Sequence, residues 1–246
     1  MNDTLLDWYA ANGRDLPWRR TTDPYAILVS EVMLQQTQVA RVIPRYEAWL
    51  ERWPTAAALA AAPLADVLGE WVGLGYNRRA LRLREACVVV AQHGWPEDLT
   101  ELPGVGAYTA AALGAFAFGR DTVALDTNVR RLFARLGREL EPRPGEGPVF
   151  NQATIELGAL VCRARAPQCD ACPFEQACTW EGDPVVERDP AVRFEDTDRW
   201  VRGRVVAALA VGEELPAIDA DRLERALDGL VRDGLVQRDG TALRLG

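Results

Sequence analysis

Apolar side chains along residues 1–180 follow the spacing of helix faces rather than the strict alternation of strands. In the segment 25–37, for example, Ile27, Leu28, Val32 and Met33 do not alternate with polar residues. Prolines and glycines divide the pattern into helix-sized pieces. The pattern therefore predicts a mainly α-helical fold, with helices over 42–53, 109–118 and 127–136 and others at the N-terminus and after Pro24, Thr55, Pro63 and Gly75.

The composition changes after Cys178. Residues 181–197 are acidic and punctuated by proline, which predicts a linker. Two further helical patterns and a predicted hairpin with Asp239 and Gly240 at its turn follow. This order is that of a small winged-helix unit, a class that binds DNA or mediates protein contacts, and the acidity of the segment favours protein contact. The predicted regions are a helical domain over 1–180, a linker over 181–197 and a winged-helix-like unit over 198–246.

The formal net charge of −8 argues at first against a nucleic-acid partner. Residues 76–84, however, contain four arginines and no acid. Because charges more than about 10 Å apart are largely screened, such a face can bind phosphates despite a negative total. A solvated helix face is the simpler interpretation of this segment. All 28 basic residues are arginines, so no lysine Schiff base can form.

Four cysteines lie close together in the sequence, with the spacing C-x6-C-x2-C-x5-C. Thiolates select zinc or an iron–sulfur cluster, and zinc frameworks usually have two tight C-x2-C arms, whereas this pattern has one. Disulfides persist mainly in secreted chains, and the N-terminus has no pattern of a secretory signal. No stretch has the length and apolarity of a membrane helix. We therefore expect a [4Fe–4S] cluster held by a loop over 162–178, with the ligands Cys162, Cys169, Cys172 and Cys178. The fifth cysteine, Cys87, is predicted to be a buried apolar residue.

A glycine-rich turn, Gly104-Val-Gly106, lies between two predicted helices. Glycine permits tight turns and close approach of the backbone to a ligand, and the N–H groups of the following helix start can bind an anion. A helix–hairpin–helix phosphate site and a plain interhelical turn both agree with this pattern.

The order of the motifs is more specific than any one of them. Leu102-Pro-Gly-Val-Gly-Ala-Tyr-Thr109 is followed by Val123-Ala-Leu-Asp-Thr-Asn-Val-Arg-Arg131 and then by the cysteines. This order resembles the helix–hairpin–helix DNA glycosylases of the endonuclease III superfamily. Further segments over 14–180 are similar to the MutY-type adenine glycosylases, namely Leu16-Pro-Trp-Arg19, Ser30-Glu-Val-Met-Leu-Gln-Gln-Thr-Gln38, Gly73-Leu-Gly-Tyr76 and Phe150-Asn-Gln-Ala153.

The resemblance implies a two-lobed helix–hairpin–helix fold and assigns the chemistry to two carboxyl groups. Glu31 matches the acid that protonates N7 of adenine and then assists water. Asp126 matches the carboxylate that stabilises the cationic sugar, and it also suits the N-cap of a helix. Tyr108 stands where relatives that cut the strand carry lysine, which implies an enzyme that only removes the base.

Other positions match supporting residues of the family. Asn128 and Glu156 match residues that hold water, Asp126 or the base. Arg19 matches a residue near the flipped purine, and Gln36 and Tyr76 match wedge residues that enter the base stack. The resemblance further implies phosphate contacts at Gly104 and Gly106 and a cluster that positions DNA.

We therefore expect a monofunctional glycosylase of base excision repair that hydrolyses the N-glycosidic bond of adenine opposite 8-oxoguanine or guanine. Its expected partner is double-stranded DNA containing a mispair. The protein is expected to be a monomer, cytoplasmic and associated with the nucleoid. The family usually has a C-terminal Nudix-like domain, but residues 181–246 are too short for it, so the opposite-base preference stays open. The alternatives are a glycosylase for T·G or U·G mismatches and a catalytically silent iron–sulfur DNA-binding protein.

Overall fold

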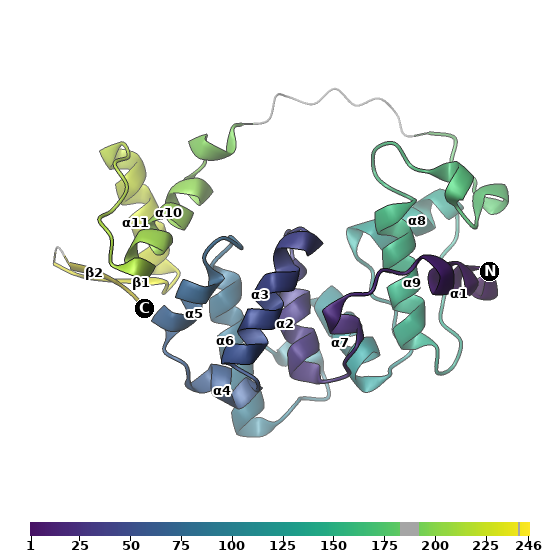
Figure 1. The fold of residues 1–246 in the computed structure, drawn as a ribbon, viewed down its shortest axis with the longest axis horizontal. Helices are drawn as coiled ribbons and strands as arrows, with labels where there is room; N and C mark the ends of the chain where they lie inside the picture. Colours follow the sequence, from purple (N-terminus) through teal and green to yellow (C-terminus); the bar gives the residue numbers. More distant parts are fainter. Residues whose placement is uncertain (183–191, 241) are drawn as a thin grey trace. The chain divides into compact units, whose positions relative to one another are not determined.

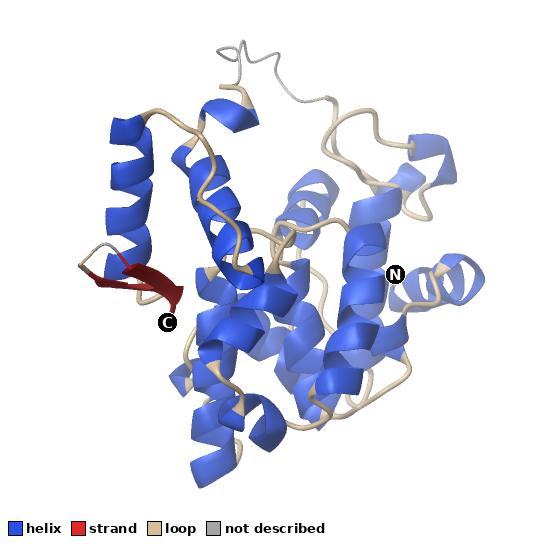
Figure 2. Ribbon diagram, turned by 60° about the vertical axis from the view of Figure 1, so that its left-hand side comes forward, coloured by secondary structure: helices blue, strands red, loops and turns tan. Residues whose placement is uncertain are grey.

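A computed structural model describes residues 1–182, 192–240 and 242–246 of the chain. Helices form most of it, as predicted, and a two-stranded hairpin lies near the C-terminus (Figure 2). Among the described residues, no helix is both long and apolar enough to cross a membrane. The helices before the cysteines are α1 (Asn2–Asn12), α2 (Pro24–Leu34), α3 (Val39–Arg52), α4 (Ala56–Ala61), α5 (Leu64–Trp71), α6 (Arg78–His93), α7 (Ala107–Phe118), α8 (Thr127–Leu136) and α9 (Gly147–Leu160).

The elements after the cysteines are the two helices and the hairpin that the sequence predicted. Helix α10 (Asp198–Val211) and α11 (Ala220–Arg232) are followed by β1 (Val236–Asp239) and β2 (Ala242–Leu245). The strands pair antiparallel, with Asp239 opposite Ala242. Short 3-10 turns complete the chain, namely η1 (Pro17–Arg19), η2 (Leu99–Glu101), η3 (Cys169–Ala171), η4 (Glu175–Ala177) and η5 (Phe194–Asp196).

Side-chain caps fix several helix starts. The Thr55 side chain accepts a hydrogen bond from the N–H of Ala58 at the start of α4, as its position before an Ala-rich run predicted. Thr197 and Asp219 cap α10 and α11 in the same way. Gly137 ends α8 in the left-handed region, with φ of 66°. Local sequence therefore determines where these helices begin and end.

The described residues form two compact units. The first contains residues 1–31, 98–100 and 105–182. In this unit α9 packs against α1, α7 and α8, and one apolar core includes side chains of α1, α8 and α9. Leu5, Phe133, Phe150 and Leu157 are members of this core.

The second unit contains residues 32–97, 101–104 and 192–246. Its core includes Trp49, Trp53 and Trp71. The ring centroid of Trp49 lies 4.7 Å from that of Trp53 and 5.4 Å from that of Trp71, and both pairs are T-shaped. Helix α10 packs against α5 and α11, and β2 contacts both α5 and α10 (Figure 1). The C-terminal elements thus share a unit with α3–α6. The predicted boundaries of a 1–180 domain and a 198–246 unit remain predictions, and residues 183–191 of the predicted linker lie outside the described residues.

Candidate active site

Helix α2 places one carboxyl group in the interior. Its residues are almost all apolar and buried, and Glu31 is only 6% exposed among them. The Tyr108 hydroxyl, from the first turn of α7, donates a hydrogen bond to the Glu31 carboxyl group. Burial raises the pKa of Glu31 to about 7, against the opposing effect of the Tyr108 hydrogen bond and with help from the negative charge of Asp126. Glu31 can therefore carry a proton near neutral pH.

Asp126 is the N-cap of α8, as the sequence predicted. Its Oδ1 accepts from the N–H of Val129 at 2.6 Å, and its Oδ2 accepts from Nδ2 of Asn128 at 2.8 Å. The start of a helix is electropositive, which stabilises a carboxylate there. Burial, together with the charges of Glu31 and Asp126, raises the pKa of Tyr108 well above its usual value. The four predicted catalytic residues, Glu31, Asp126, Tyr108 and Asn128, are thus brought together.

Arg131, which sequence reasoning did not single out, connects Asn128 to the cysteine loop. Its Nη2 donates to Oδ1 of Asn128 at 2.8 Å and to the carbonyl of Gly158 at 2.7 Å, and its Nε donates to the carbonyl of Cys162 at 2.7 Å. Gly158 allows this close packing of α9 on α8, because a Cβ there would lie 2.9 Å from the Asn128 carbonyl oxygen. The sequence could have indicated the contact between Asn128 and Arg131, because residues three apart are neighbours on one face of a helix.

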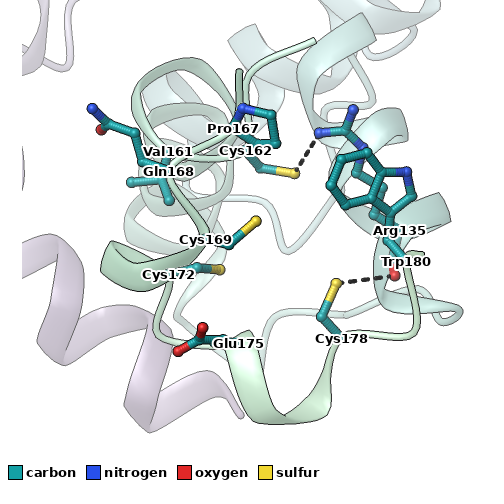
Figure 3. A pocket seen from close by; sticks show the side chains of 10 residues that line it. All are labelled: Arg135, Val161, Cys162, Pro167, Gln168, Cys169, Cys172, Glu175, Cys178 and Trp180. Atoms are coloured by element: carbon teal, nitrogen blue, oxygen red, sulfur yellow. Dashed lines mark hydrogen bonds between the residues drawn. The ribbon is translucent and has the colours of Figure 1, made fainter. Parts of the chain in front are cut away.

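The four predicted cluster ligands line one hollow of about 160 Å³, and Figure 3 shows their sulfurs pointing into the same space. Among the described residues, no three His, Cys, Asp or Glu side chains are placed to hold a single metal ion. Burial and the neighbouring thiols raise the pKa of Cys172. Cys87 is fully buried in α6, as predicted, and burial raises the pKa of its thiol to about 12.

Arg135 supplies positive charge to this hollow from the end of α8. It is 4% exposed, its Nη1 donates to Cys162 Sγ at 3.6 Å, and its guanidinium lies 4.1 Å from the ring of Trp180. Sγ of Cys178 lies 3.3 Å from the Arg135 carbonyl oxygen. Arg163 and Arg165, between the first two cysteines, are exposed.

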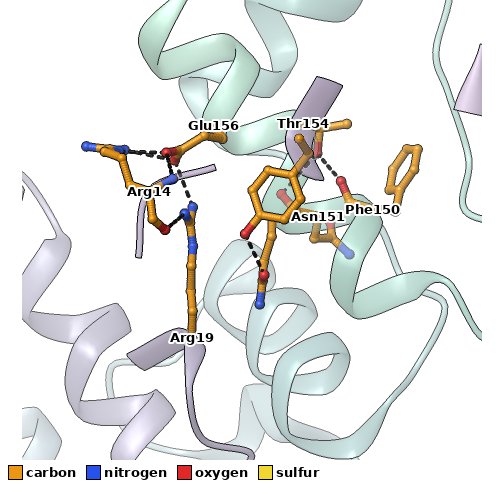
Figure 4. Close-up of polar contacts among 8 residues, drawn as sticks. Arg14, Arg19, Phe150, Asn151, Thr154 and Glu156 are labelled. Carbon is orange, nitrogen blue, oxygen red and sulfur yellow. Dashed lines mark hydrogen bonds and ion pairs between the residues drawn. The ribbon is translucent and has the colours of Figure 1, made fainter. Parts of the chain in front are cut away.

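Glu156 is a second buried carboxylate, and arginines surround it (Figure 4). Arg14 donates to it from its backbone N–H, Nε and Nη2 at 3.0, 2.7 and 2.9 Å, and Arg19 donates from Nη2 at 2.8 Å. Burial raises the pKa of Glu156, but these hydrogen bonds outweigh it and lower the pKa to about 2. The structure thus brings Arg19 and Glu156 together as an ion pair and adds Arg14, which the sequence analysis missed.

The two predicted wedge residues contact each other in the second unit. The Tyr76 hydroxyl donates to Oε1 of Gln36 at 2.6 Å. Both residues are left-handed, with φ of 55° for Gln36 and 48° for Tyr76. A non-glycine residue in this region is held by its surroundings at a cost of about 1–3 kcal/mol, and such residues gather at functional sites.

Arg79 holds these two loops together. Its guanidinium donates to six oxygen atoms, of which three are the carbonyls of Val32, Met33 and Gln35 before the Gln36 turn and three are the Thr37 hydroxyl and the carbonyls of Leu74 and Gly75. Burial lowers the pKa of Arg79 to about 10, so it is charged at neutral pH. The arginine-rich pattern of 76–84 did not reveal that this side chain turns inward.

The glycine turn has a steric basis at its first residue. Gly104 has φ of 79°, and a Cβ there would lie 2.7 Å from Cβ of Arg82. Gly106 is extended and is the N-cap of α7. The backbone N–H groups at the start of α7 agree with the predicted phosphate contact, which remains a prediction.

Comparison with known proteins places this geometry in a family. Residues 29–148 match the model of the HhH-GPD superfamily base excision DNA repair proteins. The chain is 43% identical to the adenine DNA glycosylase of Mycolicibacterium smegmatis, over 95% of this chain and 92% of the relative. It is 42% identical to that of Mycobacterium tuberculosis, over 97% and 91%. The chain belongs to the adenine DNA glycosylases.

Solved structures share the fold of this glycosylase family. A thermostable thymine-DNA glycosylase is 27% identical, with a TM-score of 0.67 over 72% of this chain and 93% of its own. An endonuclease III trapped on DNA is 24% identical, with a TM-score of 0.63 over 72% and 92%. These likenesses confirm the predicted helix–hairpin–helix glycosylase fold.

Arg79→Lys should destabilise the protein strongly. Lysine has three donors instead of five, and each buried carbonyl left without a donor costs about 1–3 kcal/mol. Arg78→Lys is the matched control, because Arg78 is exposed and, among the described residues, its one ion pair is that with Asp233 at 3.6 Å. Urea unfolding followed by circular dichroism measures both; equal midpoints would show that Arg79 does not hold the two loops.

Proposed function

We propose that this protein is a monofunctional glycosylase that hydrolyses the N-glycosidic bond of adenine mispaired with 8-oxoguanine or guanine in double-stranded DNA. One observation carries the proposal: Glu31 is a buried carboxyl group, hydrogen-bonded to Tyr108, with a pKa raised to about 7 beside the carboxylate of Asp126. Two carboxyl groups in unlike surroundings are what acid-assisted glycoside hydrolysis requires.

The proposed reaction divides the work between the two groups. Protonated Glu31 donates to N7 of adenine, which makes the base a better leaving group. As the bond to the sugar breaks, Asp126 stabilises the positive charge at C1′, held in place by the Val129 N–H and by Asn128. Glu31, now a carboxylate, accepts a proton from the water that attacks C1′. Arg131 keeps Asn128 in position, which makes it a positioning residue.

Cys162, Cys169, Cys172 and Cys178 would hold the cofactor, a [4Fe–4S] cluster. They fit it because four thiols face one hollow beside the Arg135 guanidinium, and because thiolates are the ligands that hold such clusters. A bound cluster would cross-link the loop 162–178 to itself, directly after the end of α9 at Leu160. Arg163 and Arg165 are exposed on that loop, where they can contact DNA phosphates.

We further infer a glycosylase domain over 1–180 and a winged-helix-like unit over 198–246, with the protein acting as a monomer on the nucleoid in the cytoplasm. The helix–helix–hairpin order of α10, α11, β1 and β2 supports the winged-helix assignment.

The specificity is tested with duplexes that carry A·8-oxoguanine, A·G, T·G or U·G. Adenine should be released from the first two under single-turnover conditions. Since the fold is shared with a thymine-DNA glycosylase, release of thymine without adenine would replace the proposal. Tight mispair binding without release of any base would indicate a silent DNA-binding protein.

Glu31→Gln should lower the rate of base release by about 10²–10⁴-fold while mispair binding persists, because the amide has no acidic proton. In the wild type the rate should fall as pH rises through about 7, because the raised pKa of Glu31 leaves it protonated only below that value. Tyr108→Phe removes a hydrogen bond that lowers this pKa, so the fall should move to higher pH. A rate that does not change between about pH 6 and about pH 9 would remove Glu31 from the acid role, because a group whose pKa lies near 7 titrates within that range.

The strand should stay intact after base release. The chain contains no lysine, and the phenol of Tyr108 cannot form an imine with the sugar. The abasic product should break only when alkali or heat is added, and borohydride should trap little enzyme on DNA. Tyr108→Lys should introduce some strand cleavage. Equal nicking by the wild type with and without alkali would contradict a monofunctional reaction.

The purified protein should be brown and contain iron and sulfide, as a [4Fe–4S] cluster requires. Cys169→Ser should reduce the iron content, whereas Cys87→Ser, at a buried cysteine outside the hollow, should keep it. Colourless protein with one zinc per chain would replace the cluster with a zinc site.

A further inference from the structure

Helix α10 and the loop that carries Tyr76 enclose a groove of about 380 Å³ in the second unit. This volume falls in the range of about 300–1,000 Å³ that ligand pockets span. We call it the C-terminal groove and define it by the lining residues Arg41, Tyr76, Phe194, Arg199, Trp200 and Arg204. None of its lining residues, all in the described part of the chain, is acidic.

The groove is positive although the protein carries a net charge of −8. Arg41 and Arg204 are exposed and have no ion pair with the described residues. Nearby arginines differ, because Arg202 and Arg78 both pair with Asp233. Exposed guanidinium groups without a carboxylate partner are suited to phosphate, which they bind in a bidentate way.

Aromatic rings alternate with these cations. The side chains of Tyr76 and Phe194 are 41% and 48% exposed. The Arg199 guanidinium lies 4.7 Å from the ring of Tyr76 and 4.9 Å from that of Phe194, and it also hydrogen-bonds the Tyr76 hydroxyl. Arginine from α10 therefore holds the wedge residue directly. Exposed rings interleaved with cations are the features with which proteins bind unpaired bases and their phosphates.

We propose that the C-terminal groove binds an unpaired nucleotide of the DNA substrate, with its base stacked on the exposed rings and its phosphates on Arg41 and Arg204. A fully paired duplex offers no free base face, but extrusion of adenine leaves its partner purine unpaired. The inference rests on the proposed function for the source of that nucleotide. It also revises the expectation that the acidic C-terminal segment contacts protein, because the face of α10 beside Tyr76 is basic.

Binding of fluorescein-labelled duplexes, one with a single A·8-oxoguanine pair and one fully paired, tests the groove. Arg204→Ala should weaken the mispaired duplex more than the fully paired one and reduce its slope of log K against log salt by about 1, since the phosphate contact of the unpaired nucleotide is lost. The matched control is Arg225→Ala, an exposed arginine of α11 that does not line the groove and should change neither value.

Phe194→Ala should weaken the mispaired duplex about fivefold or more and leave the paired duplex unchanged, because only an unpaired base can stack. Val231→Ala, an exposed apolar residue of α11, is its control. Circular dichroism establishes that all four variants are folded. If Arg204→Ala and Phe194→Ala bind both duplexes as the wild type does, the groove does not hold DNA.

The experiments distinguish an error in the groove proposal from an error in the proposed glycosylase function. If the groove variants bind DNA as the wild type does, and adenine release depends on Glu31, only the proposal that the groove binds a nucleotide is wrong. Weakened binding by the groove variants, with no adenine release by the wild type, would overturn only the glycosylase assignment.

Discussion

The burial of the Glu31 carboxyl group is the constraint on which the candidate active site depends. An ionised carboxylate is costly among apolar side chains, so α2, which is buried along almost its whole length, favours the neutral acid. Tyr108 and Asp126 then adjust that preference in opposite directions, and the resulting pKa lies near neutrality. The raised pKa of Glu31 therefore depends on the buried position of α2 and on polar neighbours from α7 and α8.

The first unit contains a second buried carboxyl group, that of Glu156, whose pKa is lowered instead of raised. Glu156 lies with two guanidinium groups, and its pKa is about 2, whereas that of Glu31 is about 7. Burial raises the pKa of both carboxyl groups, and hydrogen bonds from Arg14 and Arg19 outweigh this effect at Glu156. Glu156 is thereby kept charged and fixed between Arg14 and Arg19, which joins the loop after α1 to α9. Near neutral pH, Glu31 can therefore exchange a proton, whereas Glu156 stays ionised.

Much of this could be predicted because it is local in sequence. The helix starts at Thr55 and Asp126, the hairpin near Asp239 and the buried state of Cys87 all follow from capping, turn and apolar patterns. Arg14, Arg79 and Arg131 could not be predicted in their roles. Each acts through contacts with residues distant in the chain, and in sequence an arginine that turns inward looks the same as one that faces solvent. Motif order supplied the positions of Glu31 and Tyr108, but not the electrostatics that join them.

The left-handed turns at Gln36 and Tyr76 have a kinetic consequence. If Gln36 and Tyr76 enter the base stack, as the sequence analysis predicts, they would lose little conformational entropy there, because Arg79 and Arg199 already hold these residues. An enzyme that inspects many normal base pairs for each mispair benefits from such a rigid probe, since every encounter can be brief. Under that prediction, loosening the two turns would lengthen the search for a lesion before it altered the chemistry of base removal.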